Sequence, residues 1–215
     1  MKKLALLLVC SLLLTGCAAD SFLSMLGFDV YNYRAEKTVA TLAADDETAL
    51  RLTEFISGML LLSPYMTPFY GVREAADCYR DAVLAHMLGE NFARYAGNSV
   101  LLEEAREAYP YMQLQILIPA ADLETQMYSL FNGTERITHH SGELFEYLPD
   151  MEAYTAATVP DFAKISVDVI RCEETERTYR LWFYNTLDTL TPAEYFALFV
   201  KRDDGTIYCK QIENV

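Results

Sequence analysis

Apolar residues recur with a helical period through the first half of the chain. Between residues 46 and 131 they return every three or four positions, which is the spacing of a helix with one buried side. Proline or an Asn-Gly pair follows several of these segments, and both are typical of helix ends. The pattern predicts helices over 46–62, 72–88, 98–109 and 121–131.

The last third of the chain has the period of two that is typical of strands. One segment, 194–202, is apolar at nearly every position and predicts a central strand. Asp203-Asp204-Gly205 predicts a tight hairpin after it, because Asp-Gly tolerates the positive φ angles of such turns. A hairpin loop is also expected at 173–176, so four strands should form an antiparallel meander. The predicted strands are 164–172, 178–187, 194–202 and 206–212.

The segments between these two halves are mixed. Residues 112–118 alternate apolar side chains with glutamine and predict a strand that Pro119 ends, whereas 134–160 shows only short extended pieces. No repeat of 20–50 residues occurs, which excludes a solenoid. We therefore expect an α+β fold, with N-terminal helices packed on a C-terminal antiparallel sheet of about four or more strands.

The amino terminus has the features of an export signal. Lys2 and Lys3 precede an apolar run over residues 4–14, which is too short for a membrane span of about 20 residues. The run ends in Leu14-Thr15-Gly16-Cys17, which resembles the lipobox of bacterial envelope lipoproteins. The resemblance implies that Cys17 receives a diacylglycerol and becomes the first residue after cleavage. The alternative is an ordinary secretory signal with a chance cysteine.

The whole chain of 215 residues suits one domain behind a leader. We expect residues 1–16 to be a signal peptide and 17–45 to be a lipidated N-terminus that serves as a tether or packs on the domain. Residues 46–215 should form a single α+β domain, helix-rich over 46–131 and sheet-rich over 160–215.

The charge balance limits the possible partners. Seventeen basic and 31 acidic residues give a net charge of -14, which excludes electrostatic binding of nucleic acid. Loss of residues 1–16 removes two lysines and no acid, so the mature chain carries 15 basic and 31 acidic residues, a net charge of -16. Such a surface is not attracted to an anionic leaflet. We therefore expect the membrane to be contacted through the diacylglyceryl group on Cys17.

Three cysteines remain in the predicted domain, and an odd number argues against a disulfide framework. Cys78 falls in a helical pattern and is expected to be a small buried side chain. Cys172 and Cys209 fall in strand patterns and could pair only if their strands are neighbours.

Sequence motifs for catalysis, metals and cofactors are missing. The chain has no Gly-x-Ser-x-Gly, His-Glu-x-x-His, Cys-x-x-Cys or glycine-rich phosphate loop. Of its three histidines, His86 lies in a helical pattern and is expected in the core or at its rim. His139 and His140 are adjacent, so on a strand they would point to opposite faces and could not share one metal. We expect no catalytic residue, no metal and no cofactor.

One strand carries a candidate binding surface. Arg180, Trp182 and Tyr184 share a strand face, and exposed aromatic and basic residues in this arrangement can bind a ligand or a partner protein. The alternative is that helices cover this face of the sheet.

The C-terminal part of the chain has a second resemblance. A helix followed by long strands, with 195–201, Asp204-Gly205 and 207–212 at the end, is similar to the cone fold of the nuclear-transport-factor-two and ketosteroid-isomerase type. It covers about residues 70–215 and implies a curved sheet whose concave face forms a pocket. The helix at 46–62 and the strand at 112–118 depart from that pattern.

The sequence therefore predicts a lipid-anchored extracytoplasmic protein whose domain binds an unidentified protein or small ligand without catalysis. One alternative is a small-molecule enzyme of the cone-type fold, which would need two or more polar groups in one cavity. A second is a structural lipoprotein that assembles with partner chains, for which an exposed apolar patch, for example from residues 22–33, would be the sign.

Overall fold

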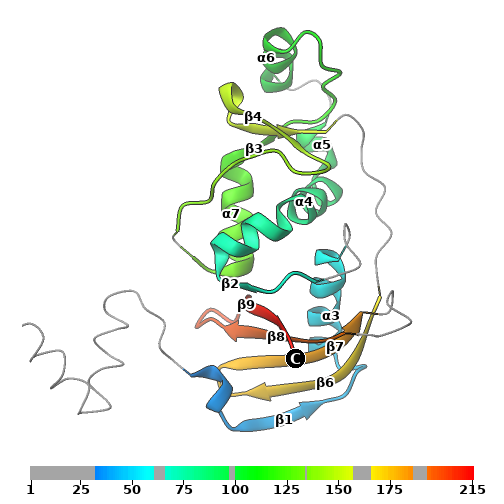
Figure 1. Cartoon of the computed structure of the whole chain (residues 1–215), viewed down its shortest axis with the longest axis vertical. Coiled ribbons are helices and arrows are strands. Elements are labelled where there is room, and N and C mark those ends of the chain that lie inside the picture. The colour runs from blue at the N-terminus through cyan, green and yellow to red at the C-terminus, as the bar shows by residue number, and fades with distance from the viewer. Residues whose placement is uncertain (1–31, 61–65, 97–99, 134, 157–165, 186–192) are drawn as a thin grey trace, which may run out of the picture. The chain divides into compact units, whose positions relative to one another are not determined.

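The computed structural model describes residues 32–60, 66–96, 100–133, 135–156, 166–185 and 193–215 (Figure 1). The chain divides into two compact units, residues 1–37 and 38–215. In the first unit the described part holds a 3-10 turn, η1 (Tyr33–Ala35). The predicted signal peptide, the lipobox and Cys17 lie outside the described residues. Among the helices that are described, none is both long and apolar enough to cross a membrane.

The second unit is built on a six-stranded antiparallel sheet with the strand order β1-β6-β7-β8-β9-β2. The predicted meander is confirmed, because the four C-terminal strands are neighbours in sequence order and β8 lies inside the sheet. Two strands from the first half of the chain extend it at the edges. The strands are β1 (Thr38–Leu42), β2 (Phe69–Tyr70), β6 (Val167–Thr175), β7 (Thr178–Asn185), β8 (Glu194–Lys201) and β9 (Ile207–Asn214).

The two hairpins of the meander differ in how well the sequence predicts them. Asp204-Gly205 forms the expected turn between β8 and β9, where Gly205 has φ +83° and Arg202 N–H donates to Thr206 O over 2.7 Å. The loop expected at 173–176 is wrong. β6 continues through Thr175, since Glu173 and Glu174 are paired across the ladder with β7, and the link is only two residues long.

The predicted helices are confirmed with small shifts in their ends. α3 begins after Asp46, whose carboxylate accepts the Thr48 N–H over 2.8 Å and so caps the helix. The last long helix ends at Phe131 and is followed by Asn132, which has φ +50°. The helices are α3 (Glu47–Met59), α4 (Val72–Glu90), α5 (Phe92–Tyr95), α6 (Val100–Ala108) and α7 (Ala120–Phe131).

The main core lies between one face of this sheet and the helices α3, α4 and α7. α3 contacts β6 and α4, while near the opposite edge of the sheet α4 contacts β2 and α7 contacts β9 (Figure 1). Aromatic side chains fill the space between them. The ring centroid of Phe55 lies 5.4 Å from that of Phe199 and 6.0 Å from that of Phe131. The strands contribute Leu181 and Phe183 to the same cluster. The expected packing of helices on one face of the sheet is therefore present.

A second, smaller sheet lies next to α6. It has the order β3-β5-β4 and a separate core cluster that includes Leu102, Leu114 and Leu148. Its strands are β3 (Ile118–Pro119), β4 (Glu146–Leu148) and β5 (Ala153–Thr155), and the 3-10 turn η2 (Pro149–Met151) links the last two.

The strand predicted over 112–118 is wrong except at its end. Only Ile118 joins a ladder, in β3 with Pro119, and Ile116 forms a single bridge to Ala96. The reason is that the remaining backbone binds elsewhere: Leu114 O accepts from Arg106 Nε over 3.0 Å and Leu117 N–H donates to Tyr95 O over 2.9 Å. Residues 112–117 therefore have no continuous strand partner.

All three described cysteines are free thiols. Cys172 in β6 and Cys209 in β9 are separated by β7 and β8, so three spacings of about 4.8 Å lie between their strands and no bridge can form. Cys78 is exposed rather than buried. It lies within the predicted helix but on the side that does not face the core.

Candidate functional site

A loop between α7 and β4 separates two hollows in the second unit. We call residues 138–145 the 138–145 loop. The first hollow, of about 490 Å³, lies on the side of β4 and β5, and the second, of about 300 Å³, lies on the side of α4. Gly142 and Glu143 line both hollows, so the loop forms their common wall.

Two neighbouring charged residues of α4 hold the 138–145 loop in place. Arg80 donates to Thr138 O over 3.0 Å and to His140 O over 3.2 Å, and its Nη2 lies 2.9 Å from His140 Nε2. Asp81 Oδ2 accepts the Leu144 N–H over 2.8 Å. Both are buried, at 3% and 8% exposed, which is unusual for charged residues of a helix.

The two adjacent histidines have different partners. His140 faces Arg80, with Asp77 3.8 Å from Nε2, whereas His139 lies between Tyr154 and Glu124 at 2.9 and 3.0 Å. This arrangement fits an imidazole that accepts from the Tyr154 hydroxyl and donates to Glu124. Tyr154 is fully buried, and burial raises its pKa to about 12. The His139 group therefore joins α7 to the small sheet and has no accessible hydroxyl to offer a substrate.

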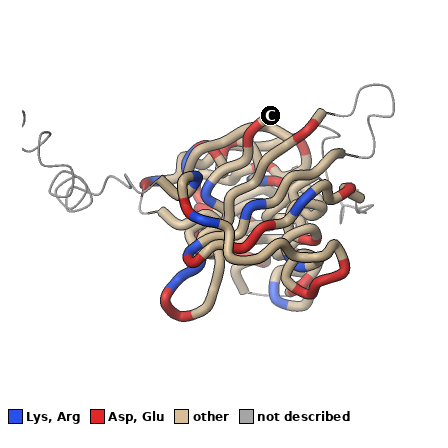
Figure 2. The backbone as a smooth tube through the Cα atoms, turned by 90° about the horizontal axis from the view of Figure 1, so that it is seen from below, with Lys and Arg blue, Asp and Glu red and all other residues tan. Residues whose placement is uncertain are grey.

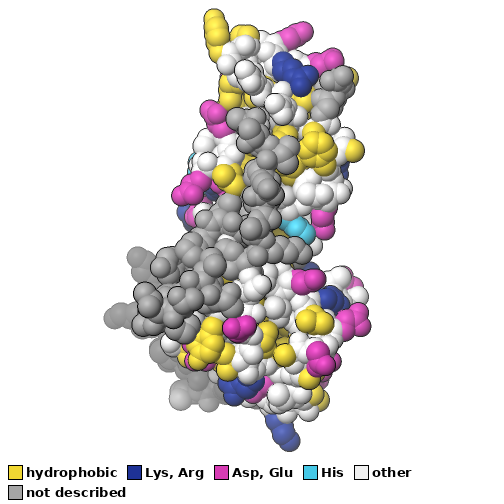
Figure 3. Space-filling model, turned by 90° about the vertical axis from the view of Figure 1, so that its right-hand side faces the viewer, with side chains coloured by type: hydrophobic (Ala, Val, Ile, Leu, Met, Phe, Trp, Pro, Cys, Tyr) yellow, Lys and Arg dark blue, Asp and Glu magenta, His cyan; other side chains and the backbone are white. Residues whose placement is uncertain are grey.

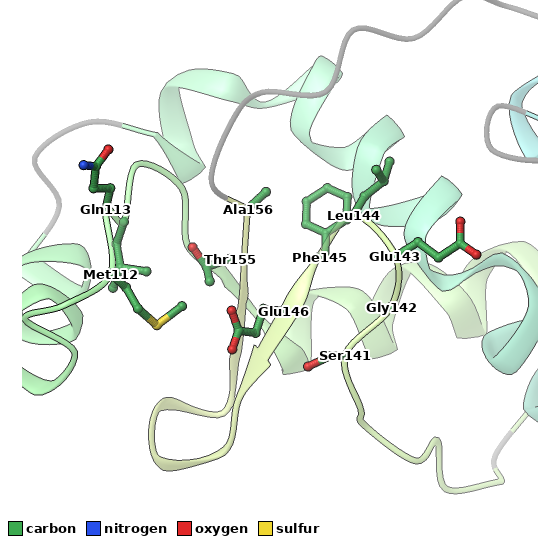
Figure 4. A pocket seen from close by; sticks show the side chains of 11 residues that line it. Met112, Gln113, Ser141, Gly142, Glu143, Leu144, Phe145, Glu146, Thr155 and Ala156 are labelled. Atoms are coloured by element: carbon green, nitrogen blue, oxygen red, sulfur yellow. The ribbon is translucent and has the colours of Figure 1, made fainter.

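Two hydroxyl side chains, those of Ser141 and Thr155, line the first hollow (Figure 4). Ser141 Oγ accepts the Tyr147 N–H over 3.0 Å, and Thr155 Oγ1 donates to Ile116 O over 2.7 Å. Neither hydroxyl has a histidine or carboxylate partner, so the pair of nucleophile and base that covalent catalysis needs is not formed by these residues. Its described lining residues are Met112, Gln113, Leu114, Ser141, Gly142, Glu143, Leu144, Phe145, Glu146, Thr155 and Ala156.

The second hollow is rich in carboxylates. Asp77, Asp81 and Glu143 line it together with Cys78, Arg80, His140 and Gly142. Burial, and then the charges of Asp77 and Glu74, raise the pKa of the Cys78 thiol. A thiol with a raised pKa is a poor nucleophile at neutral pH. The chemistry that this hollow can offer is therefore the binding of positive charge.

The residues of the predicted binding face do share one side of the large sheet. The ladder places Arg180, Trp182 and Tyr184 opposite Leu198, Phe196 and Glu194, on the side turned away from the core side chains Leu181 and Phe183. This face of the sheet therefore points away from α3, α4 and α7. The alternative that helices cover it is wrong for these three helices.

Contacts within that face restrict what the three residues can do. The Arg171 guanidinium lies 3.7 Å from the centre of the Trp182 ring, and Phe196 packs 5.0 Å from it. Arg180 is only 7% exposed and lies 3.6 Å from Glu173. Sequence analysis missed Arg171, because a bulge in β6 between Val169 and Arg171 brings it onto the face of Trp182.

Opposite charges alternate over the described surface. Figure 2 shows Lys and Arg positions next to Asp and Glu positions rather than gathered in one patch. Examples are the pair of Arg94 and Asp122 at 2.7 Å and that of Lys201 and Glu174 at 2.6 Å. His86 also lies on this surface, half exposed and 3.2 Å from Glu90, rather than in the core. The surface therefore offers no concentrated positive field for an anionic ligand.

The described residues contain no group of three His, Cys, Asp or Glu side chains that could hold a metal ion. The sequence analysis did not identify the buried Arg80 and Asp81. The signal in the sequence is only an adjacent pair of opposite charges within a helical pattern, which more often lies on the surface. Comparison with protein-family models, curated proteins and solved structures finds no match, so the functional argument rests on the residues and contacts given above.

Proposed function

We propose that this chain is a lipid-anchored extracytoplasmic protein whose α+β domain binds a ligand or a protein without catalysing a reaction. The observation that carries the proposal is the order Lys2-Lys3, an apolar run, and Leu14-Thr15-Gly16-Cys17. Two acyl chains on Cys17 would be enough for stable attachment to a bilayer. The net charge of the mature chain, -16 after removal of two lysines, favours attachment through lipid rather than through the protein surface.

The contacts around the two hollows support binding rather than catalysis. Ser141 and Thr155 use their hydroxyls for backbone contacts, and His139 and His140 are held by structural partners. The thiol of Cys78 has a raised pKa. The described hydroxyl and imidazole groups near the hollows thus have structural partners, and the thiol is in a poor state for reaction.

The alternative of a cone-type enzyme finds less support. Such an enzyme would use one face of the large sheet as a pocket, and the helix-covered face is instead filled by Leu181, Phe183 and Phe199. The alternative of a structural lipoprotein rests on residues 22–33, most of which lie outside the described residues. On the face shown in Figure 3, the described hydrophobic side chains form separate small groups between charged ones, which favours a surface in contact with water.

Metabolic labelling with a clickable fatty-acid analogue tests the anchor. Cells producing the native chain, Cys17→Ala or Cys78→Ala should be compared by in-gel detection and by fractionation. We expect label and membrane association for the native chain and for Cys78→Ala, and neither for Cys17→Ala. A native chain that remains unlabelled and in the cytosol would overturn the proposal.

A further inference from the structure

Asp81 is a buried carboxylate without a cationic partner. It is 8% exposed and lies in the wall of the second hollow. Its Oδ2 accepts the Leu144 N–H over 2.8 Å, but its Oδ1 has no hydrogen-bond donor. No Lys, Arg or His in the described part of the chain forms an ion pair with it, since the guanidinium of the neighbouring Arg80 is directed to Thr138 and His140 and lies 3.7 Å from Asp77. A buried charge in this state is strongly unfavourable unless something neutralises it.

The surroundings of Asp81 add negative charge rather than remove it. Asp77 and Glu143 also line the hollow, and Arg80 is the one guanidinium among its described lining residues, which also include His140. Arg80 already donates to the 138–145 loop through both Nη atoms. Asp77, Asp81 and Glu143 outnumber Arg80 by three to one, and the carboxylate nearest to Arg80 Nη2 is that of Asp77, at 3.7 Å, rather than that of Asp81. The missing partner is therefore a cation.

The size of the hollow and the positions of its carboxylates indicate which kind of cation it can bind. Its volume of about 300 Å³ is about ten times the share of one water molecule in the liquid, far more than a bare metal ion fills. The described carboxylates do not converge into a metal-binding group. A primary ammonium carries three hydrogen-bond donors and one charge, which suits separated carboxylate acceptors. We infer that the second hollow binds a small organic cation through a primary ammonium group, with Asp81 as its main acceptor.

Entry of the ligand involves the 138–145 loop. Gly142 lies against the Asp81 carboxylate, where a Cβ atom would overlap Asp81 Oδ1. Oδ1 is out of contact with solvent beneath Gly142, so the inferred binding requires the Gly142 segment to move aside before an ammonium can reach this oxygen. The exposed carboxylates of Asp77 and Glu143 form the outer part of the route. The inference names a ligand class for the proposed binding role and does not depend on lipidation, so the two can fail separately.

Titration of the full chain in a non-ionic detergent tests the inference. Ethanolamine hydrochloride is the probe, and tetramethylammonium, calcium and sodium chlorides at equal ionic strength are the comparisons. Calorimetry should show saturable binding of ethanolamine, accompanied by a rise in the thermal unfolding midpoint. Tetramethylammonium has the charge but no N–H donor, and it should bind at least about tenfold more weakly.

Variants of the hollow separate Asp81 from general charge effects. Asp81→Asn keeps an acceptor for Leu144 N–H and should weaken ethanolamine binding at least about tenfold. Asp77→Asn, at an exposed position, should weaken it only about two- to fivefold. Glu90→Gln on the same helix is the matched control and should bind as the native chain does. Asp77→Lys brings a tethered ammonium to the hollow and should abolish ethanolamine binding. This variant still tests the inference if Asp81→Asn does not fold.

Three results would overturn the inference. One is an equal rise in the thermal unfolding midpoint with all salts at the same ionic strength, because that rise would come from general screening of the negative charges of the chain. Another is unchanged ethanolamine binding in both Asp81→Asn and Asp77→Lys. The third is saturable binding of calcium but not of ethanolamine, which would make the hollow a metal site.

Discussion

Burial of individual side chains decides which groups of this protein can react or bind. Asp81 and Cys209 are both enclosed, but of the two only the carboxyl group of Asp81 lies at a hollow. Burial raises the pKa of the Cys209 thiol far above its usual range and that of Cys172 to about 11. These two thiols are therefore neutral, inert parts of the core.

A first prediction concerns the order in which the thiols react. At pH 8, maleimide should modify Cys78 in the native chain and leave Cys172 and Cys209 unmodified, since only Cys78 is exposed. The raised pKa of Cys78 should make its reaction slower than that of a free cysteine. Peptide mapping by mass spectrometry, with and without urea, measures this. Modification of Cys209 at the rate of Cys78 in the folded chain would contradict the described core.

At the scale of elements, the 138–145 loop is the connection on which the site depends. It has little regular structure, and its position comes from Arg80 and Asp81 of α4. A buried hydrogen bond to a charged group contributes about 1.5–3 kcal/mol. The loop is thus fixed by a few strong contacts with a helix that lies about sixty residues earlier in the chain.

A second prediction follows for the glycine at the centre of this loop. Gly142→Ala should lower the free energy of unfolding by about 1–3 kcal/mol, because the added Cβ would overlap the Asp81 carboxylate. Urea unfolding followed by circular dichroism measures the change.

Gly89→Ala is the control for the loop variant. Gly89 lies near the end of α4, and a Cβ there would meet nothing within 4 Å. Alanine should therefore leave stability unchanged or raise it by about 0.5–1 kcal/mol. If both variants unfold at the same urea concentration, the contact between Gly142 and Asp81 is not as described.

At the scale of the whole molecule, the large sheet joins distant parts of the chain. β1 and β2 come from the first third of the sequence and close the two edges of a meander formed by the last third. The compact unit accordingly begins at Thr38, ahead of the start at residue 46 that the sequence suggests. Leu42 of β1 pairs with Cys172 and packs on the main core.

A third prediction compares two shortened chains. A chain that begins at Thr38 should keep the whole sheet, whereas one that begins at Asp46 lacks β1. Loss of the ladder with β6 and of the Leu42 contact should lower the free energy of unfolding by about 2–3 kcal/mol. Urea unfolding of both chains gives the difference, and equal midpoints would show that β1 does not stabilise the sheet.

The hydrophobic periodicities of the sequence were sufficient to predict most of the helices and strands. Local signals such as the Asp46 cap, the Asn132-Gly133 end of α7 and the Asp204-Gly205 turn act within a few residues, so they can be read directly. They failed at 112–118, where alternation suggested a strand but the backbone groups of Leu114 and Leu117 bind Arg106 and Tyr95 instead. Strand formation requires a partner, and periodicity does not say whether one is present.

By itself, the sequence determined the α+β class, the meander with its Asp204-Gly205 turn and the face shared by Arg180 and Trp182, because each depends on neighbours in the chain. It also contains Lys2-Lys3, the apolar run and Cys17, on which the proposed lipid anchor rests. Only the tertiary structure decided that two strands separate those of Cys172 and Cys209, that β1 completes the sheet, and that Asp81 is buried without a cationic side-chain partner among the described residues. These features depend on which distant segments meet, and the free energy of a charge depends on what surrounds it in space.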